Sequence, residues 1–261
     1  MNSKKLSGKV ALITGGGTGI GREIACTFAS NGARIIICDI NLKSLEKTKM
    51  LINKSGGKAC AIESDISEEK QVSHLISNLI QQFGRLDILI NNASIVGQVS
   101  SVENLNLLEW NKTLSVNLTG AMLCCRESIP YLRTSKGSIV NVSSNVGRRG
   151  FPNRSPYVCS KWALQGLTQT TALELAKFDI RVNAICPGPV LTDRLKHAAK
   201  LMAEKEGVTL ETIMNNWALE SPMGRFVTEK ECAKAALFLA SQDSSGITGQ
   251  SLNITAGALM T

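Results

Sequence analysis

A tyrosine and a lysine lie four residues apart in the segment SPYVCSKWAL (155–164). Positions four apart on an α-helix share one face, with Cβ atoms about 5–6 Å apart, so the phenol of Tyr157 would lie beside the ammonium of Lys161. A free phenol has a pKa of about 10. One cation at about 4 Å, with an effective dielectric near 20, supplies roughly 4 kcal/mol, or about three pKa units before desolvation. Such a pair could exchange a proton with a substrate hydroxyl near neutral pH.

The alternative for this pair is a buried aromatic ring near a solvated lysine, because this spacing is common by chance. Ser155-Pro156 suits the start of a helix, which places both residues in its first two turns. Tyr131 has a serine four residues later, and we interpret it as a packing or surface residue. The rest of the chain has to decide between the two interpretations.

A glycine-rich turn, TGGGTGIG (14–21), follows the strand-like run VALIT (10–14) and precedes a helix-like stretch. Glycines allow close backbone approach, and a helix N-terminus offers N–H groups to a pyrophosphate. Asp39 ends the next strand-like run, 18 residues after Gly21. Its carboxylate can bind ribose hydroxyls and would repel a 2′-phosphate, so the pattern predicts NAD rather than NADP. A P-loop is excluded because the Gly-Lys-Ser/Thr ending is absent.

The elements that must position these residues are short β-branched runs alternating with longer amphipathic stretches. They predict an α/β, doubly wound Rossmann-type fold, with a seven-stranded parallel sheet and helices on both faces. Residues 1–261 form one expected domain, with 192–225 as a substrate-binding insertion after the sixth strand. The expected strands are 10–14, 34–39, 58–65, 86–93, 137–144, 180–187 and 250–257.

Composition excludes several classes of protein. The 261 residues are 43% hydrophobic and 19% charged, as in ordinary globular proteins. The net charge of +8 comes from dispersed basic residues, so we expect no nucleic-acid partner. No apolar run reaches the roughly 18 residues that span a bilayer, so we expect no membrane segment.

The eight cysteines are scattered and form no Cys-x-x-Cys pair, which favours reduced structural thiols in the cytoplasm. The two histidines, His74 and His197, lack ligand spacing, so no metal site is expected. Of five Asn-x-Ser/Thr sequons, those at Asn141 and Asn253 lie inside strand-like runs where a glycan could not fit. The scattered cysteines and the sequons inside strand-like runs favour an intracellular protein.

Over almost its whole length the chain resembles the short-chain dehydrogenase/reductase family. TGGGTGIG is similar to that family's Thr-Gly-x-x-x-Gly-x-Gly turn, and NNAS (91–94) to its Asn-Asn-Ala-Gly. YVCSK (157–161) resembles its Tyr-x-x-x-Lys, and PGPVLT (187–192) its Pro-Gly segment beside the nicotinamide. Two segments depart from the pattern: Ser94 replaces a glycine, and ITAGALM (254–260) replaces the usual Asp-Gly-Gly ending.

The resemblance implies four catalytic residues. Tyr157 would be the acid/base and Lys161 its activator. Ser144, thirteen positions before Tyr157, would orient the substrate oxygen, with Ser143 as the alternative serine. Asn117 would hold a water that connects Lys161 to solvent.

The resemblance also implies a cofactor site and a homo-oligomer, commonly a tetramer. Asp65 and Ile66 would flank the adenine, and Asn92 and Ala93 would approach the ribose. Val190 and Thr192 would bind the carboxamide. The expected NAD-binding residues are Gly15, Gly17, Thr18, Gly19, Ile20, Gly21, Asp39, Asp65, Ile66, Asn92, Ala93, Tyr157, Lys161, Pro187, Val190 and Thr192.

We therefore expect an NAD-dependent oxidoreductase that transfers hydride between nicotinamide and a secondary alcohol or carbonyl substrate: a small hydroxy compound, a sugar, a cyclic diol or a hydroxy acid. Two alternatives are an NADP-dependent 3-oxoacyl reductase and a non-catalytic NAD(H)-sensing scaffold. Asp39 argues against the first, and the complete catalytic set against the second.

Substrate specificity is expected from 94–103, 145–154 and 192–225. Arg148, Arg149 and Arg154 could bind an anionic substrate group or could be solvated surface residues. Trp217 and Met214 could form an apolar lid wall or pack the insertion.

Overall fold

Seven parallel strands form one sheet, in the order β3-β2-β1-β4-β5-β6-β7. The computed structural model describes residues 4–260, apart from the side chains of Arg194, Leu201 and Lys205. The sheet confirms the predicted Rossmann-type class. Its strands are β1 (Val10–Thr14), β2 (Arg34–Asp39), β3 (Lys58–Glu63), β4 (Ile88–Asn91), β5 (Ser138–Val142), β6 (Arg181–Pro187) and β7 (Ser251–Ile254).

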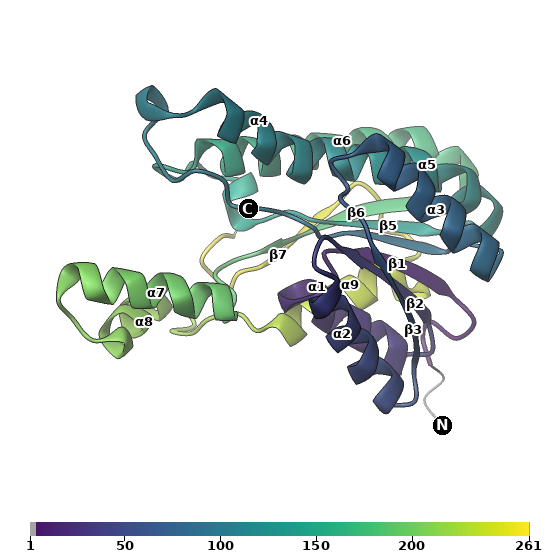
Figure 1. Cartoon of the computed structure of the whole chain (residues 1–261), viewed down its shortest axis with the longest axis horizontal. Coiled ribbons are helices and arrows are strands. Elements are labelled where there is room, and N and C mark those ends of the chain that lie inside the picture. The colour runs from purple at the N-terminus through teal and green to yellow at the C-terminus, as the bar shows by residue number, and fades with distance from the viewer. Residues whose placement is uncertain (1–3, 261) are drawn as a thin grey trace.

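Helices cover both faces of the sheet (Figure 1). One face carries α1 (Gly19–Ser30), α2 (Leu42–Lys54) and α9 (Glu229–Ala240). The other carries α3 (Glu69–Phe83), α4 (Leu107–Leu114), α5 (Gly120–Ser135) and α6 (Ser155–Leu175). Short helical turns are η1 (Val102–Asn104), the π-helical η2 (Ser115–Thr119), η3 (Asn145–Gly147), η4 (Ala176–Phe178) and η5 (Gln242–Ser244).

Strand β1 explains why the sheet needs helices on both sides. Ala11 and Ile13 pack into the core beneath α1, α2 and α9, whereas Val10 and Leu12 pack into the core of the opposite face. All four are fully buried. Because successive strand residues point to opposite faces, a continuously apolar strand is stable only when both faces are covered.

The strand order reverses between β1 and β4, because β2 and β3 lie on one side of β1 and the later strands on the other. In open parallel sheets the ligand crevice lies at such a point, outside the carboxyl ends of the strands. The glycine turn follows β1 at this edge, and NNAS begins at the end of β4.

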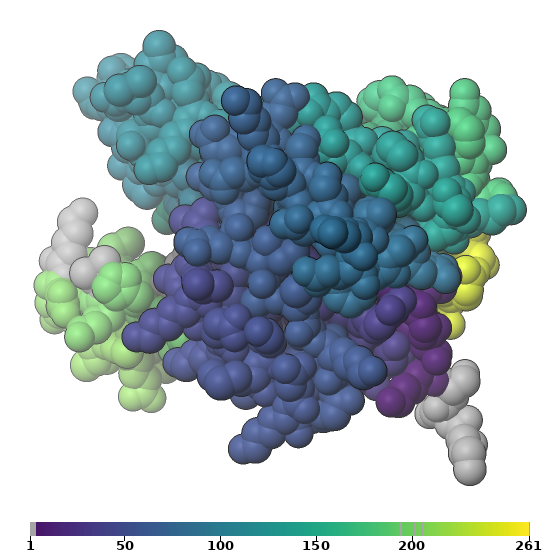
Figure 2. Space-filling model, turned by 45° about the vertical axis from the view of Figure 1, so that its right-hand side comes forward, coloured from purple at the N-terminus to yellow at the C-terminus, as the bar shows by residue number. Residues whose placement is uncertain are grey.

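Two helices, α7 (Asp193–Glu206) and α8 (Leu210–Leu219), follow β6 at the same edge. They project from one side of the molecule (Figures 1 and 2). They have a small core of their own, in which Ala199, Ala203 and Ile213 are buried and Met214 and Trp217 pack against them. Met214 thus packs the inserted segment, which was one of the two alternatives that the sequence left open.

All eight cysteines are free thiols. Burial raises the pKa of Cys38, Cys125 and Cys232 to about 12, which keeps these thiols protonated and unreactive. Within residues 4–260, no helix is long and apolar enough to cross a membrane. The described side chains contain no group of three or more His, Cys, Asp and Glu residues that could hold a metal ion.

Candidate active site

The turn between β1 and α1 is packed too closely for side chains. Gly15 has a φ of 64°, and a Cβ there would lie 2.8 Å from the Cα of Ala93. A Cβ at Gly21 would lie 2.2 Å from the carbonyl oxygen of Gly15. Real Cβ contacts are not this short, so glycine is required at both positions. The turn therefore lies directly against the end of β4.

The N-terminus of α1 carries no side-chain cap. Thr18 occupies the N-cap position with an extended backbone, but its side chain accepts no hydrogen bond from the first turn. The first N–H groups of a helix have no partner within the helix itself. Those of Gly19, Ile20 and Gly21 can therefore bind an anion, and the turn fits a dinucleotide pyrophosphate.

Asp39 lies beside this turn at the end of β2. Its Oδ2 accepts a hydrogen bond from the Gly17 N–H at 3.3 Å, and its Oδ1 accepts one from the Asn41 N–H at 3.1 Å. The next residue in the chain, Ile40, is uncharged. The guanidinium of Arg22 donates to the Gly17 carbonyl and to Thr48 Oγ1. A carboxylate in this position can accept hydrogen bonds from a ribose diol, and the Arg22 guanidinium beside it is bound to protein atoms.

The end of β4 is tied to the glycine turn through Thr14. Thr14 Oγ1 accepts hydrogen bonds from the N–H groups of Asn92 at 3.0 Å and Ala93 at 3.1 Å. The Asn92 side chain donates to the carbonyl oxygens of Thr14 at 2.9 Å and Gly15 at 3.1 Å. The strand stops at Asn91, two residues earlier than predicted, because these groups bind the neighbouring turn instead of β5. Sequence reasoning missed this role of Thr14.

Asp65 and Ile66 lie in the loop after β3, which also ends two residues before its predicted limit. Asp65 Oδ1 accepts hydrogen bonds from the Ser67 N–H at 2.9 Å and hydroxyl at 2.7 Å. Ile66 is buried against Gly120, where a Cβ would come within 2.8 Å of the isoleucine side chain. The loop is therefore held by its own turn and by the start of α5.

Tyr157 and Lys161 are brought together in the first two turns of α6. The Lys161 Nζ lies 5.5 Å from the centre of the Tyr157 ring. Lys161 is only 2% exposed, and its Nζ donates to the carbonyl oxygen of Val142 at 2.8 Å. Helical spacing thus places the ammonium beside the phenol, as the sequence predicted, and the structure adds that the lysine is buried.

The two serines that follow β5 have different surroundings. The Ser143 hydroxyl donates to the carbonyl oxygen of Lys161 at 3.0 Å, so it joins the sheet to α6. The Ser144 hydroxyl donates to Asn145 Oδ1 at 3.1 Å and accepts from the Val146 N–H at 3.4 Å, both within its own loop. Of the two, Ser144 is the one whose hydroxyl is not bonded to α6.

Asn117 lies in the π-helical turn η2 and is buried. Its side-chain Oδ1 accepts from the Ile95 N–H at 2.8 Å, while its Nδ2 donates to the Ile95 carbonyl at 2.9 Å and to Ser160 Oγ at 3.0 Å. Asn117 therefore links the loop after β4 to the residue that precedes Lys161. This link through Ser160 was not predicted.

The segment PGPVLT connects β6 to α7. Pro187 ends β6, and Val190 forms an isolated parallel bridge with Val227. Thr192 caps α7, with its hydroxyl accepting from the Leu195 N–H at 3.2 Å. The segment is thus held at the same edge of the sheet as Ser144.

A carboxylate on α9 faces the start of α1. Glu229 Oε1 lies 3.7 Å from the position that a Cβ would take at Gly19. Burial, followed by the nearby carboxylates of Glu23 and Asp193, raises the pKa of Glu229, although Arg22 and Lys196 oppose the shift. A bound pyrophosphate would add negative charge near the same group.

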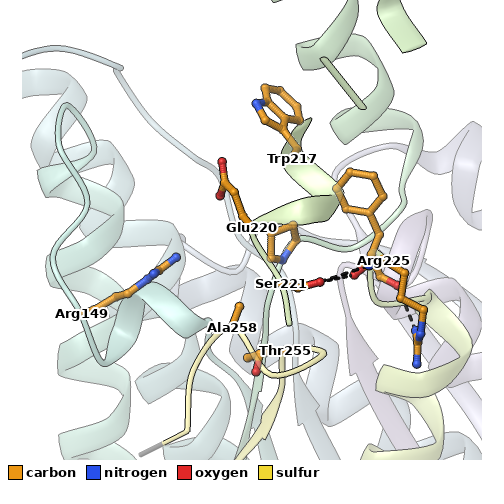
Figure 3. A pocket seen from close by; sticks show the side chains of 9 residues that line it. Arg149, Trp217, Glu220, Ser221, Arg225, Thr255 and Ala258 are labelled. Carbon is orange, nitrogen blue, oxygen red and sulfur yellow. Dashed lines mark hydrogen bonds between the residues drawn. The ribbon is translucent and has the colours of Figure 1, made fainter. Parts of the chain in front are cut away.

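A cavity of about 260 Å³ opens beside the loop that follows Ser144 (Figure 3). Its lining includes Arg149, Trp217, Glu220 and Ala258. Trp217 therefore both packs the insertion and walls the cavity. Of the other two arginines of the loop, neither lines the cavity: Arg148 donates to the Ser251 carbonyl on β7 at 3.3 Å, and Arg154 precedes α6.

Comparison with known sequences links this chain to oxidoreductases. The family described as enoyl-(acyl carrier protein) reductase matches residues 15–258. The chain is 35% identical over 260 residues to 3-oxoacyl-[acyl-carrier-protein] reductase of Thermotoga maritima, covering 98% of this chain and 100% of the relative. It is 33% identical over 261 residues to trans-4-hydroxycyclohexanecarboxylate dehydrogenase of Sinomonas cyclohexanicum, covering 98% of this chain and 94% of the relative.

A solved structure of NAD⁺-bound xylitol dehydrogenase superimposes on the chain with a TM-score of 0.91 at 33% sequence identity. The match covers 97% of this chain and all of the other chain. The whole fold, including the edge that carries the glycine turn and the Tyr157–Lys161 pair, is therefore shared with a dinucleotide-binding dehydrogenase.

Proposed function

The chain belongs to the short-chain dehydrogenase/reductase family, and we propose that it is an NAD-dependent enzyme that interconverts a small secondary alcohol and its ketone. The observation that carries this proposal is the buried Lys161 ammonium beside the Tyr157 ring, one loop away from Ser144. A phenol, a cation and a hydroxyl in this arrangement can together transfer a proton to or from an alcohol oxygen.

In the oxidative direction Tyr157, as phenolate, removes the proton of the substrate hydroxyl. Lys161 stabilises the phenolate, and its burial strengthens this interaction because water does not screen it. Ser144 donates a hydrogen bond to the substrate oxygen as its charge develops. NAD, when bound, supplies the hydride acceptor. The N–H groups of the α1 N-terminus would hold its pyrophosphate, and Asp39 its adenosine ribose.

Preference for NAD over NADP is supported by Asp39, whose carboxylate accepts hydrogen bonds from two backbone N–H groups. A 2′-phosphate would bring a second negative charge to this position. At about 4 Å, two like charges repel by roughly 1 kcal/mol in water and by more near a protein surface.

The size of the cavity favours a small substrate. At about 260 Å³ it is below the range of roughly 300–1,000 Å³ that is usual for drug-sized ligands. A hydroxylated six-membered ring or a short polyol suits it, and the names of the relatives include both kinds of compound. The alternative, reduction of a 3-oxoacyl carrier protein with NADPH, is represented by the Thermotoga relative.

The first test is a paired titration of the purified protein with NADH and NADPH, followed by turnover assays on cyclic alcohols, polyols, hydroxy acids and 3-oxoacyl thioesters. We expect NADH to bind at least tenfold more tightly and NAD⁺ to support oxidation of a cyclic alcohol. Tighter NADPH binding with thioester reduction would select the carrier-protein alternative. NADH binding without turnover of any class would favour a cofactor-sensing role.

We also propose a cytoplasmic homo-oligomer, commonly a tetramer among relatives of this family. The eight free thiols suit a reducing compartment. Large apolar side chains are exposed on the helical layer of α4 and α6, at Leu107, Leu108, Trp162 and Leu173. Exposed apolar side chains on one layer of helices are the kind of surface that protein interfaces cover. Light scattering coupled to gel filtration would give the mass of the assembly.

A further inference from the structure

On the premise of the oxidoreductase function above, we propose that the substrate carries a carboxylate remote from its reacting hydroxyl, and that Arg149 binds this carboxylate. The proposal assigns a substrate class to the cavity and one residue to its recognition.

The cavity lies at the carboxyl edge of the sheet, where the catalytic loop is. Arg149 stands five residues after Ser144 in the loop that follows β5, Pro189 follows β6, and Thr255 follows β7. Gly147, between Ser144 and Arg149, packs against α6, since a Cβ there would lie 2.8 Å from the Lys161 carbonyl oxygen. A molecule that fills the cavity therefore borders the loop that carries the catalytic serine.

Among the described residues that line this cavity, Arg149 is the cation that forms no ion pair. Arg225 also lines it, but its guanidinium is bound to Glu231, with its two terminal nitrogens 2.8 and 3.1 Å from the carboxylate oxygens. In Figure 3 Arg149 extends toward the open space, whereas the end of the Arg225 side chain turns away from it. Among the described side chains, no acidic group forms an ion pair with Arg149.

A guanidinium offers two parallel N–H donors to a carboxylate, which makes it suitable for binding that group in one orientation. Glu220 lines the same cavity from the end of α8 and also lacks an ion-pair partner in the described structure. Its negative charge disfavours a carboxylate at that wall and directs the anion to Arg149. The ring of Trp217 supplies apolar surface for the carbon skeleton between the two ends.

The test compares two substrates of equal shape, trans-4-hydroxycyclohexanecarboxylate and its uncharged carboxamide, in three proteins: wild type, Arg149→Gln and Arg154→Gln. Arg154 is the matched control because it belongs to the same loop and does not line the cavity. We expect Arg149→Gln to lower kcat/KM for the acid about 10- to 100-fold, mainly through KM. Turnover of the carboxamide and the activity of Arg154→Gln should change less than threefold.

A second variant tests the other charge of the cavity. Glu220→Gln should raise kcat/KM for the acid several-fold, because it removes a repelling carboxylate, and should leave the carboxamide unchanged. Equal losses for acid and carboxamide in Arg149→Gln, or wild-type preference for the carboxamide, would overturn the proposal.

A binding measurement keeps this test independent of turnover. Cyclohexanecarboxylate has no hydroxyl to oxidise, and its calorimetric affinity for wild type in the presence of NADH should exceed that of cyclohexanecarboxamide and be lost in Arg149→Gln. If the protein oxidises cyclohexanol yet binds the two probes equally, the proposal fails and the oxidoreductase function stands. If it binds the carboxylate through Arg149 but oxidises no alcohol, the assignment of Arg149 to carboxylate binding stands and the oxidoreductase function fails.

Discussion

At the scale of single residues, the proposed proton transfer depends on the burial of Lys161. A buried ammonium is costly unless polar groups surround it, and here the Val142 carbonyl and the face of the Tyr157 ring are its neighbours. The same burial reduces screening by water, so the cation acts on the phenol more strongly than an exposed lysine would. Ser143 fixes the helix by binding the backbone of Lys161 itself.

Replacing Tyr157 by phenylalanine removes the proton-transferring hydroxyl and little else. We expect kcat to fall about 10²- to 10⁴-fold, the usual contribution of general acid–base catalysis. NADH affinity, measured by nicotinamide fluorescence, should change less than threefold. Tyr131→Phe serves as the control, and a variant at position 157 that kept a tenth of the wild-type kcat would rule out the assigned role.

Glu229 predicts a pH dependence of cofactor binding. Its pKa is raised by burial and by Glu23 and Asp193, and its carboxylate faces the N-terminus of α1 at Gly19. As pH rises through this raised pKa, the group becomes charged and repels the pyrophosphate, so NADH affinity should weaken. In Glu229→Gln the dependence should disappear, with binding at pH 8 tighter by about fivefold, or about 1 kcal/mol.

The measurement is the NADH dissociation constant from pH 5 to 8 in wild type, Glu229→Gln and Glu174→Gln. Glu174 is an exposed carboxylate on α6 and should leave the profile unchanged. An identical pH profile in wild type and Glu229→Gln would show that Glu229 does not act on the cofactor.

At the scale of elements, the β1–α1 turn depends on glycines that differ sharply in their surroundings. A Cβ at Gly21 would lie 2.2 Å from the Gly15 carbonyl and 2.5 Å from Asn92 Nδ2, whereas one at Gly166, in the middle of α6, would meet nothing within 4 Å. Gly21→Ala should therefore displace the turn, and Gly166→Ala should stabilise its helix by about 0.5–1 kcal/mol.

The two variants can be compared with the wild type by thermal unfolding and by NADH titration. We expect Gly21→Ala to weaken NADH binding at least tenfold and to lower Tm, and Gly166→Ala to raise Tm slightly with normal NADH binding. Unaltered NADH affinity in Gly21→Ala would mean that the cofactor does not need the close approach that this turn provides.

At the scale of the whole molecule, the edge of the sheet opposite the active site is held by a buried carboxylate. Asp87 is 1% exposed and accepts hydrogen bonds from the Val10 N–H at 3.0 Å, from Lys9 at 3.1 Å and from Arg85 at 2.6 and 2.8 Å. Burial opposes its ionisation, but the hydrogen bonds from Arg85, Val10 and Lys9 outweigh it, so the pKa of Asp87 is lowered.

A lowered folded-state pKa stabilises the protein above the unfolded value of about 3.9, and this contribution is lost as pH falls through the folded value. Asp87→Asn should therefore reduce the free energy of unfolding at pH 7 by about 3 kcal/mol. The variant should also lose less of its remaining stability than the wild type as pH falls below about 4. Asp179→Asn is the control, because the Asp179 side chain is 68% exposed in its pair with Lys136 and should contribute at most about 1 kcal/mol. The measurement is urea unfolding of both variants at pH 3 to 7. Equal urea midpoints for the two variants would contradict the stabilising role of Asp87.

Local patterns in the sequence were enough to predict the seven strands, the glycine turn, Asp39 at the end of β2 and the shared face of Tyr157 and Lys161. These features depend on periodicity and on residues close together in the chain, where backbone geometry alone dictates the arrangement. The ends of β3, β4 and β5 were predicted two residues too late and the end of β7 three residues too late. At β4 the reason is that Thr14 and Asn92 tie the backbone to the glycine turn.

Only the tertiary structure separated residues whose local sequence is alike. Ser143 and Ser144 are adjacent, yet their hydroxyls differ because the Lys161 carbonyl lies within reach of just one. Arg148, Arg149 and Arg154 share a loop, but Arg148 binds the Ser251 carbonyl on β7, whereas Arg149 lines a cavity together with Trp217 of α8. The sequence by itself determined the fold class and the shared helical face of Tyr157 and Lys161. Which neighbouring side chain is bound within the protein and which lines the cavity was decided by segments distant in the chain, since contacts and burial exist only once these segments pack together.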